Sequence, residues 1–342
     1  MGGIAMDSRQ RFAHWPEFSG VLTDEMTDRQ LLGLPDHFDA KCNLPTPVDW
    51  QVCLQAPAEK LVEYIQDPLS SLAVRLAAGK ILGFTTDRRI RTFEPQMQAV
   101  PGGAVQVGLP VAEIDSVMHA MRGLGLQRSW IEKETPRFTV MLDSFSLAKY
   151  PVTNGEYRAF LEDSLEPRIP ENWPFGQYPA ERSNHPVYGL TVDDVDAYID
   201  WLNQRTGRRF RLPSESEWEY AAAGPENRVF PWGHDFLPDH CNTAESGIFS
   251  TTAVGSFPRG VSPFGCLDMA GNVEEYVADD YAPYPGGHSV DDDLVNTVGT
   301  YRIARGGSFT RFRDLARNCR RHGRYPRPIY VMGFRLAETA LR

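Results

Sequence analysis

The sequence predicts an α+β fold with little regular secondary structure. Three short helices beyond residue 150 each begin with the same capping signal, and the stretches between them are irregular and rich in Gly, Pro and Asn. Beyond Gly224 no helical period persists, so we expect turns, short strands and buried aromatic side chains there. Short helices among loops and strands are typical of an α+β domain.

A chain of 342 residues favours two structural units or one large unit with an appendage. We expect residues 1–95 to form a helical extension and residues 96–342 to form the main domain. Residues 1–55 show no clear hydrophobic period, so we expect them to be coil with short helices that wrap around the domain.

Two helices are predicted in the extension. The first runs from Pro57 to Ile65, because Pro suits a first helical turn and the apolar residues that follow share one face. The second begins at a cap on Ser70 and ends near Gly83, since a mostly apolar run lies between a capping residue and a glycine. We therefore expect two packed helices.

Capping boxes predict the starts of three helices in the main domain. In a capping box, a hydroxyl and a carboxylate three residues apart satisfy each other's backbone amides. The boxes pair Thr153 with Glu156, Thr191 with Asp194, and Ser214 with Glu217. Gly207 and Gly224 then stop the second and third helices. The helix after Thr191 shows the strongest amphipathic period of the chain.

Composition excludes several classes of function. Asp and Glu number 45 against 35 Lys and Arg, and a net charge of −10 opposes binding of nucleic acid by bulk charge. No uninterrupted apolar run reaches about 18 residues, so no transmembrane helix is expected. Asp7, Arg9 and Arg11 interrupt the place where a signal peptide needs its apolar core, so we expect a cytoplasmic protein. Five cysteines without a CxxC pair indicate neither a disulfide framework nor a zinc site.

Residues 302–327 form a basic segment with nine arginines and one acid, Asp314. The planar guanidinium binds carboxylates and phosphates in a bidentate manner, so this segment predicts a cleft for an anionic small molecule or peptide. The candidate ligand-binding residues are Arg311, Arg313, Arg320, Arg324, Tyr325, Phe312 and Ser308.

The alternative is that some of these arginines have a structural role. Arginines that point inward would pair with buried acids such as Glu217 and Glu275 and hold the loops together. The candidates for this role are Arg317, Arg321 and the later Arg335.

Six segments occur in the order typical of one known family. They are LDSFSLAKYPVTNGEYRAFLED (142–163), HPVYGLTVDDVDAYIDWLN (185–203), FRLPSESEWEYAAAG (210–224), FPWG (230–233), VGSFPRGVSPFGCLDMAGNVEEYVADDY (254–281) and ARGGSF with GFRLA (304–309, 333–337). Over about residues 96–340 the chain resembles the formylglycine-generating enzyme, or sulfatase-modifying factor, superfamily. This resemblance implies a C-type-lectin-like α+β fold, often with structural calcium.

The resemblance also implies where metals would bind. Formylglycine-generating enzymes hold copper on two cysteines after the GGS motif, but those positions read Arg311 and Ala316 here, and Cys319 has no partner thiol. Copper is therefore disfavoured. In its sequence segments the chain more closely resembles the sulfoxide synthases of ergothioneine and ovothiol biosynthesis, and those enzymes hold iron on three histidines. No two histidines stand four residues apart here, so catalytic iron is left open without a ligand set.

The segment GNVEEY is similar to a calcium-binding segment of the superfamily. Asn272, Val273 and Glu275 are the residues expected to hold a structural Ca²⁺, since carbonyl, amide and carboxylate oxygens suit this ion. The alternative is that these groups only cap turns.

Two classes of function follow. The resemblance favours an O₂-dependent oxidase or oxygenase with a non-haem metal, acting on an anionic small molecule or peptide. The alternative is a non-catalytic, lectin-like module that binds a ligand or protein through the arginine-rich C-terminal loop. Residues 1–95 are a further candidate for holding a protein partner.

Overall fold

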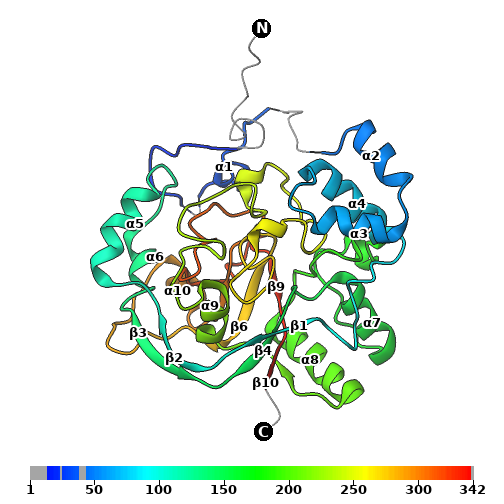
Figure 1. The fold of residues 1–342 in the computed structure, drawn as a ribbon. Coiled ribbons are helices and arrows are strands. Elements are labelled where there is room, and N and C mark those ends of the chain that lie inside the picture. The colour runs from blue at the N-terminus through cyan, green and yellow to red at the C-terminus, as the bar shows by residue number, and fades with distance from the viewer. Residues whose placement is uncertain (1–13, 24, 38–43, 340–342) are drawn as a thin grey trace.

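The computed structural model describes residues 14–23, 25–37 and 44–339, so the expectation drawn from Asp7, Arg9 and Arg11 lies outside the described residues. Four helices come first in the chain: α1 (Asp28–Leu31), α2 (Pro47–Leu54), α3 (Ala58–Gln66) and α4 (Leu72–Phe84). Helices α2, α3 and α4 lie together at one corner of the molecule (Figure 1). None of the described helices is long and apolar enough to cross a lipid bilayer.

The rest of the chain is an α+β assembly in which loops carry much of the structure, as predicted. Its helices are α5 (Ile114–Ala120), α6 (Arg128–Glu132), α7 (Asn154–Ser164), α8 (Val192–Thr206), α9 (Glu215–Ala223) and α10 (Asp293–Val298). Its strands are β1 (Met97–Val100), β2 (Gly103–Val107), β3 (Phe138–Leu142), β4 (Phe145–Ala148), β5 (Phe210–Arg211), β6 (Glu274–Asp280), β7 (Arg302–Arg305), β8 (His322–Gly323), β9 (Met332–Phe334) and β10 (Ala337–Thr339).

The strands form three small sheets. One has the order β1-β4-β10-β5, a second pairs β2 with β3, and the third has the order β8-β7-β6-β9. In the third sheet β6 runs antiparallel to β7 and parallel to β9, so Glu275 lies opposite both Arg305 and Gly333. This third sheet lies near the centre of the molecule and carries the acids discussed below (Figure 1).

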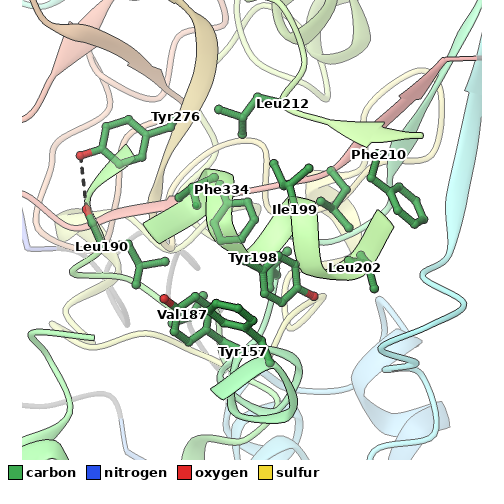
Figure 2. Close-up of a cluster of buried hydrophobic side chains, with 14 of the residues drawn as sticks. Tyr157, Val187, Leu190, Tyr198, Ile199, Leu202, Phe210, Leu212, Tyr276 and Phe334 are labelled. Atoms are coloured by element: carbon green, nitrogen blue, oxygen red, sulfur yellow. Dashed lines mark hydrogen bonds between the residues drawn. The ribbon is translucent and has the colours of Figure 1, made fainter. Parts of the chain in front are cut away.

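The largest apolar core joins α7 and α8 to the third sheet. Tyr157, Tyr198 and Phe334 are fully buried, and the rings of Tyr157 and Tyr198 stack with centroids 5.8 Å apart. Figure 2 shows this cluster, in which the Tyr276 hydroxyl donates to the carbonyl of Leu190 at 3.4 Å. The hydrogen bond connects the sheet to the loop before α8.

Local sequence signals predicted three helix starts of the main domain correctly. All three predicted capping boxes are formed, at Thr153, Thr191 and Ser214. The cap of α4 is Ser71, however, and not the predicted Ser70, because the Ser71 hydroxyl is the one that accepts from the third amide of the helix. Helix α10 contradicts the expectation of no helix beyond Gly224, and at six residues it is too short to show a period.

Helix α4 packs closely against the main domain through its glycines. The Asn184 amide donates to the carbonyl of Gly79 at 3.0 Å, and the Ser183 hydroxyl donates to that of Gly83 at 2.5 Å. A Cβ atom at Gly79 would lie 2.7 Å from the Ala253 side chain, so only glycine permits this approach. The exact boundary at residue 95 stays a prediction.

A buried ion pair follows α4 and connects it to the domain. The carboxylate of Asp87 accepts from Arg89 at 2.6 and 2.9 Å and from the Asn184 amide at 2.8 Å.

The Asp87→Asn variant leaves the Arg89 charge buried without a counter-ion, so we expect the free energy of unfolding to fall by about 3–5 kcal/mol in urea denaturation. The control Glu59→Gln, in an exposed pair with Arg88, should change it by less than about 0.5 kcal/mol. Equal losses in both variants would contradict this role.

His185 makes the fold sensitive to acid. Burial lowers the pKa of His185 to about 3, and its Nδ1 lies 3.0 Å from the Thr251 hydroxyl. Below about pH 6.5 the unfolded state binds a proton that the native state does not, so stability falls with falling pH. We expect the free energy of unfolding to drop by about 2 kcal/mol more between pH 7 and pH 5 in the wild type than in His185→Gln. Parallel pH curves for the two proteins would refute it.

Candidate functional site

The arginines around residues 302–327 are mostly paired with carboxylates inside the domain. The buried pairs, with N–O distances between 2.5 and 2.9 Å, are Arg305 with Glu215 and Glu219, Arg317 with Glu134, Arg321 with Glu215, and Arg335 with Glu275. The structural role predicted for Arg317, Arg321 and Arg335 is confirmed. Glu217 was a wrong choice of partner, since it pairs with Arg211 at 2.6 Å next to its own helix cap.

The four arginines predicted to bind a ligand do not converge on one place. Arg311 contacts Glu274 at 3.2 Å, Arg313 contacts Glu245 at 3.3 Å, Arg320 lies 3.7 Å from both Glu134 and Asp314, and Arg324 contacts Glu171 at 2.6 Å. Arg311 and Arg320 line a cavity, whereas Arg313 and Arg324 are not among its lining residues. Their side chains face acids on other elements, which local sequence could not indicate.

This cavity, here called the His322 cavity, has a volume of about 90 Å³. It lies between the N-terminal segment, helices α6 and α10, and the C-terminal loops. The wall residues used below are Trp130, Lys133, Arg311, Phe312, Arg320, His322, Tyr325 and Tyr330. Phe312 and Tyr325 were predicted for the site. Ser308, also predicted, is buried outside this wall with its hydroxyl 2.9 Å from that of Thr310.

A carboxylate and an imidazole form the chemical centre of the cavity. Nδ1 of His322 lies 2.5 Å from a carboxylate oxygen of Glu274, and Nε of Arg311 donates to the other oxygen at 3.2 Å. The His322 ring stacks on Tyr330 with centroids 5.3 Å apart, and the Arg311 guanidinium lies 3.9 Å from the Tyr330 ring centroid. The imidazole is therefore held by an acid on one edge and an aromatic ring on one face.

The register of the third sheet places this pair. Ala304 in β7 lies opposite both Tyr276 in β6 and His322 in β8. Glu274 is two residues before Tyr276 and so shares its face of the sheet. Because the side chain of Ala304 is small, His322 reaches across β7 to Glu274.

The protonation states suit proton transfer. Although burial opposes its charge, His322 and Arg311 hold the pKa of Glu274 below its usual range. Burial lowers the pKa of His322, so its imidazole is neutral at pH 7. With Glu274 ionised, Nδ1 carries the proton that is donated to it, and Nε2 is left as the acceptor.

A second buried pair, Lys133 with Asp292, also lines the cavity. Lys133 contacts Asp292 and lies 3.1 Å from the hydroxyl of Tyr301. Burial lowers the pKa of Lys133 to about 8. Asp292 caps α10, and the indole of Trp130 donates to Asp293 at 2.6 Å, so α6 and α10 are joined at this wall.

The N-terminal segment completes the cavity. The amide of Leu22 donates to the carbonyl of Gly125 at 2.9 Å, and Arg327 donates to the carbonyl of Met26 and to Asp28 at 2.7 and 2.6 Å. Leu22, Thr23 and Leu31 then line the cavity. These residues therefore contact the domain and form part of the cavity wall, and the predicted wrap of residues 1–55 as a whole stays a prediction.

Comparison with known proteins identifies the family. The family model of the sulfatase-modifying factor enzyme 1-like domain matches residues 85–340. The chain belongs to this family. It is 29% identical to the hercynine oxygenase of Mycolicibacterium smegmatis over 244 residues, which are 60% of this chain and 56% of that protein. It is 33% identical to the formylglycine-generating enzyme of Mus musculus over 233 residues, 52% of this chain and 60% of that protein.

The chain therefore spans a little over half the length of these two relatives. Among solved structures it is similar to PvdO from Pseudomonas aeruginosa, with a TM-score of 0.56 and 27% identity over 72% of this chain and 95% of that one. Treponema denticola variable protein 1 has a TM-score of 0.52 at 18% identity, over 71% of this chain and 94% of that one, and so shares the fold.

The residues present do not fit the copper site of family members. Its two positions hold Arg311, which contacts Glu274, and Ala316, which is buried in an apolar cluster. Across the described residues, no three His, Cys, Asp or Glu side chains gather as a metal site. Neither copper nor a three-histidine iron is therefore assigned to the His322 cavity.

The side chains expected to bind calcium have other partners. Glu275 accepts from Arg335 at 2.5 and 2.6 Å and from the indole of Trp218 at 2.7 Å. The Asn272 amide oxygen accepts from the backbone amide of Thr252 at 3.0 Å, and Val273 is buried beside it. These side chains do not fit a calcium ligand set as they stand, and the calcium site stays a prediction.

Sequence reasoning missed the central residues of the cavity. The sequence has eight histidines and no two stand four residues apart, so spacing does not single out His322, and Glu274 is not among the residues predicted from GNVEEY. A usable signal was the tandem acid in GNVEEY, since consecutive strand residues point to opposite faces and two acids there need two different partners. No comparable sequence pattern indicates Lys133 or Tyr330.

Replacing the buried Arg317 should lower the stability of the protein far more than replacing the half-exposed Arg324. Arg317→Met leaves the fully buried Glu134 with Arg320 at 3.7 Å as its nearest cation, so we expect the free energy of unfolding to fall by about 3–5 kcal/mol. Arg324→Met removes a pair whose acid, Glu171, is largely exposed, so a loss below about 1 kcal/mol is expected. Chemical denaturation of both variants measures the difference, and similar losses would show that burial does not set the cost.

Proposed function

We propose that the chain is an oxidoreductase that uses dioxygen to oxidise an anionic small molecule or a peptide side chain bound in the His322 cavity. The observation that carries this proposal is the position of the His322 imidazole, which lines the cavity and whose Nδ1 lies 2.5 Å from the Glu274 carboxylate. Burial lowers the pKa of His322, which favours the neutral form. The oxidative character is inferred from the hercynine oxygenase and formylglycine-generating enzymes to which the chain is similar.

His322 acts as the general base in this proposal. Nε2 accepts a proton from the substrate while Nδ1–H keeps its hydrogen bond to Glu274, and the carboxylate stabilises the imidazolium that forms. Tyr330 and Arg311 hold the ring and the carboxylate in place. The net reaction removes two electrons and two protons from the substrate and reduces dioxygen to hydrogen peroxide.

Two buried donors support an anionic substrate. Arg311 and Arg320 line the cavity, and within the described residues Nη2 of Arg311 and Nε of Arg320 are buried without a hydrogen-bond partner. Leaving such donors unmatched is costly, and a carboxylate or phosphate of the substrate would satisfy them. The small volume of the cavity admits the reacting end of a ligand, which suits a peptide side chain as well as a small molecule.

The test follows oxygen uptake by the purified protein in a metabolite extract, with mass spectrometry of the consumed anionic compound. His322→Gln should lower the rate at least about 100-fold, as for loss of a general base, and Arg324→Met should leave it unchanged. Since a base must be unprotonated and burial lowers the pKa of His322, the acid limb of the pH–rate profile should lie below pH 6.5. Unchanged turnover in His322→Gln would exclude this role.

A non-catalytic binding module is the second candidate. It is favoured by the substitution of both copper positions and by the absence of a metal-ligand cluster in the part of the chain that the structure describes. For a binding module, no compound would be consumed. An anionic compound from the extract would be recovered unchanged, bound to the protein, and the His322→Gln variant would still bind it. For residues 1–95, the exposed Val48, Val52 and Leu54 of α2 are the surface we propose for a protein partner.

A further inference from the structure

Among the described residues, one buried cationic side chain, that of Arg75, has no carboxylate partner. Within the described residues, every other buried arginine or lysine side chain lies within 4.0 Å of a carboxylate, namely Arg89, Lys133, Arg305, Arg317, Arg320, Arg321 and Arg335. Arg75 of α4 is 4% exposed, and no ion pair to it is found in the described structure. A buried charge without a counter-ion is costly, so the missing anion calls for an explanation.

The contacts of Arg75 leave part of its guanidinium unused. Nη1 donates to the carbonyl of Ser256 at 2.5 Å, and the guanidinium lies 5.7 Å from the ring centroid of Phe257. Nε is buried and has no hydrogen-bond partner in the part of the chain that the structure describes. Burial lowers the pKa of Arg75 only to about 10, so the side chain remains charged at neutral pH.

Arg75 lines a cavity of about 300 Å³ between the start of α4 and the loop that contains Leu237. This volume is at the lower end of the range for small-molecule sites. The first turn of the 13-residue α4 also faces it through Ser71 and Leu72, and a helix N-terminus favours negative charge. We call this the Arg75 cavity. It shares no lining residue with the His322 cavity.

The wall limits the ligand to one negative charge and an apolar body. Its ionisable side chains are Arg75, Arg259 and Asp239, with Arg259 and Asp239 paired at 3.2 Å, so its net charge is that of one cation. Apolar surface comes from Leu69 and Leu237, among others. A dianionic phosphate would meet the repulsion of Asp239 with only one surplus positive charge to offset it.

We propose that the Arg75 cavity binds the carboxylate of an organic acid with an apolar body, placing the carboxylate against Arg75 and the first turn of α4. The bound carboxylate supplies the counter-ion that the protein itself does not. This site is independent of the function proposed for the His322 cavity.

Calorimetric titration of the full chain tests the proposal with three probes: hexanoate, hexan-1-ol and inorganic phosphate. Hexanoate should bind at least tenfold more tightly than hexan-1-ol or phosphate. Arg75→Met should weaken hexanoate binding at least tenfold, and Arg259→Met about threefold. Arg88→Met is the matched control, because Arg88 is exposed, pairs with Glu59 and lies outside the cavity wall, and it should leave the affinity unchanged.

Several results would overturn the site. Equal binding of hexan-1-ol would make it a purely apolar cavity, and tighter binding of phosphate would replace the carboxylate by a phosphate group. Unchanged hexanoate affinity in Arg75→Met, or no binding to the wild type, would exclude it. Circular dichroism checks the fold of each variant. If Arg75→Met does not fold, the exposed Arg259→Met variant decides, and full hexanoate affinity there would refute the proposal.

Discussion

Buried guanidinium–carboxylate pairs hold together the part of the chain where helices and strands are sparse. Arg335 shows how: it binds both oxygens of Glu275 and also donates to the carbonyls of Ala148 and Leu267. One guanidinium has five donors in a fixed plane, so it can satisfy an acid and several loop carbonyls at once, which a lysine cannot. Loops that are buried need such partners because their backbone groups find none in regular ladders.

The same network positions the candidate site. Glu274 and Glu275 are consecutive in β6 and therefore point to opposite faces of the strand. Glu275 faces the arginine that holds the core, while Glu274 faces His322 and the cavity. The buried Glu275–Arg335 pair thus anchors the strand that also carries Glu274, so the carboxylate beside His322 is held in a fixed position.

The two cavities differ in how their charges are balanced. Lys133 and Arg311 in the His322 cavity both have carboxylate partners, so only individual donors of its arginines remain unmatched. In the Arg75 cavity, Arg75 has no carboxylate partner among the residues that the structure describes. Residues that precede the matched family domain help to build both, since Leu22 and Leu31 line the first and α4 lines the second. Residues of the extension therefore form part of the walls of both cavities.

Local signals in the sequence determined the starts of α7, α8 and α9 and indicated the family. A capping box such as Thr191 with Asp194 acts within one turn, so its outcome does not depend on the rest of the chain. The ordered motifs likewise indicate the family fold from the sequence alone.

Only the tertiary structure decided which arginine meets which acid. Arg317 and Glu134 are 183 residues apart, and His322 and Glu274 are 48 apart. Every arginine between residues 302 and 327 carries the same charge and the same donors, so nothing local distinguishes a structural arginine from one that faces a cavity. That distinction arises from burial and from the register of the third sheet, which are properties of the folded chain as a whole.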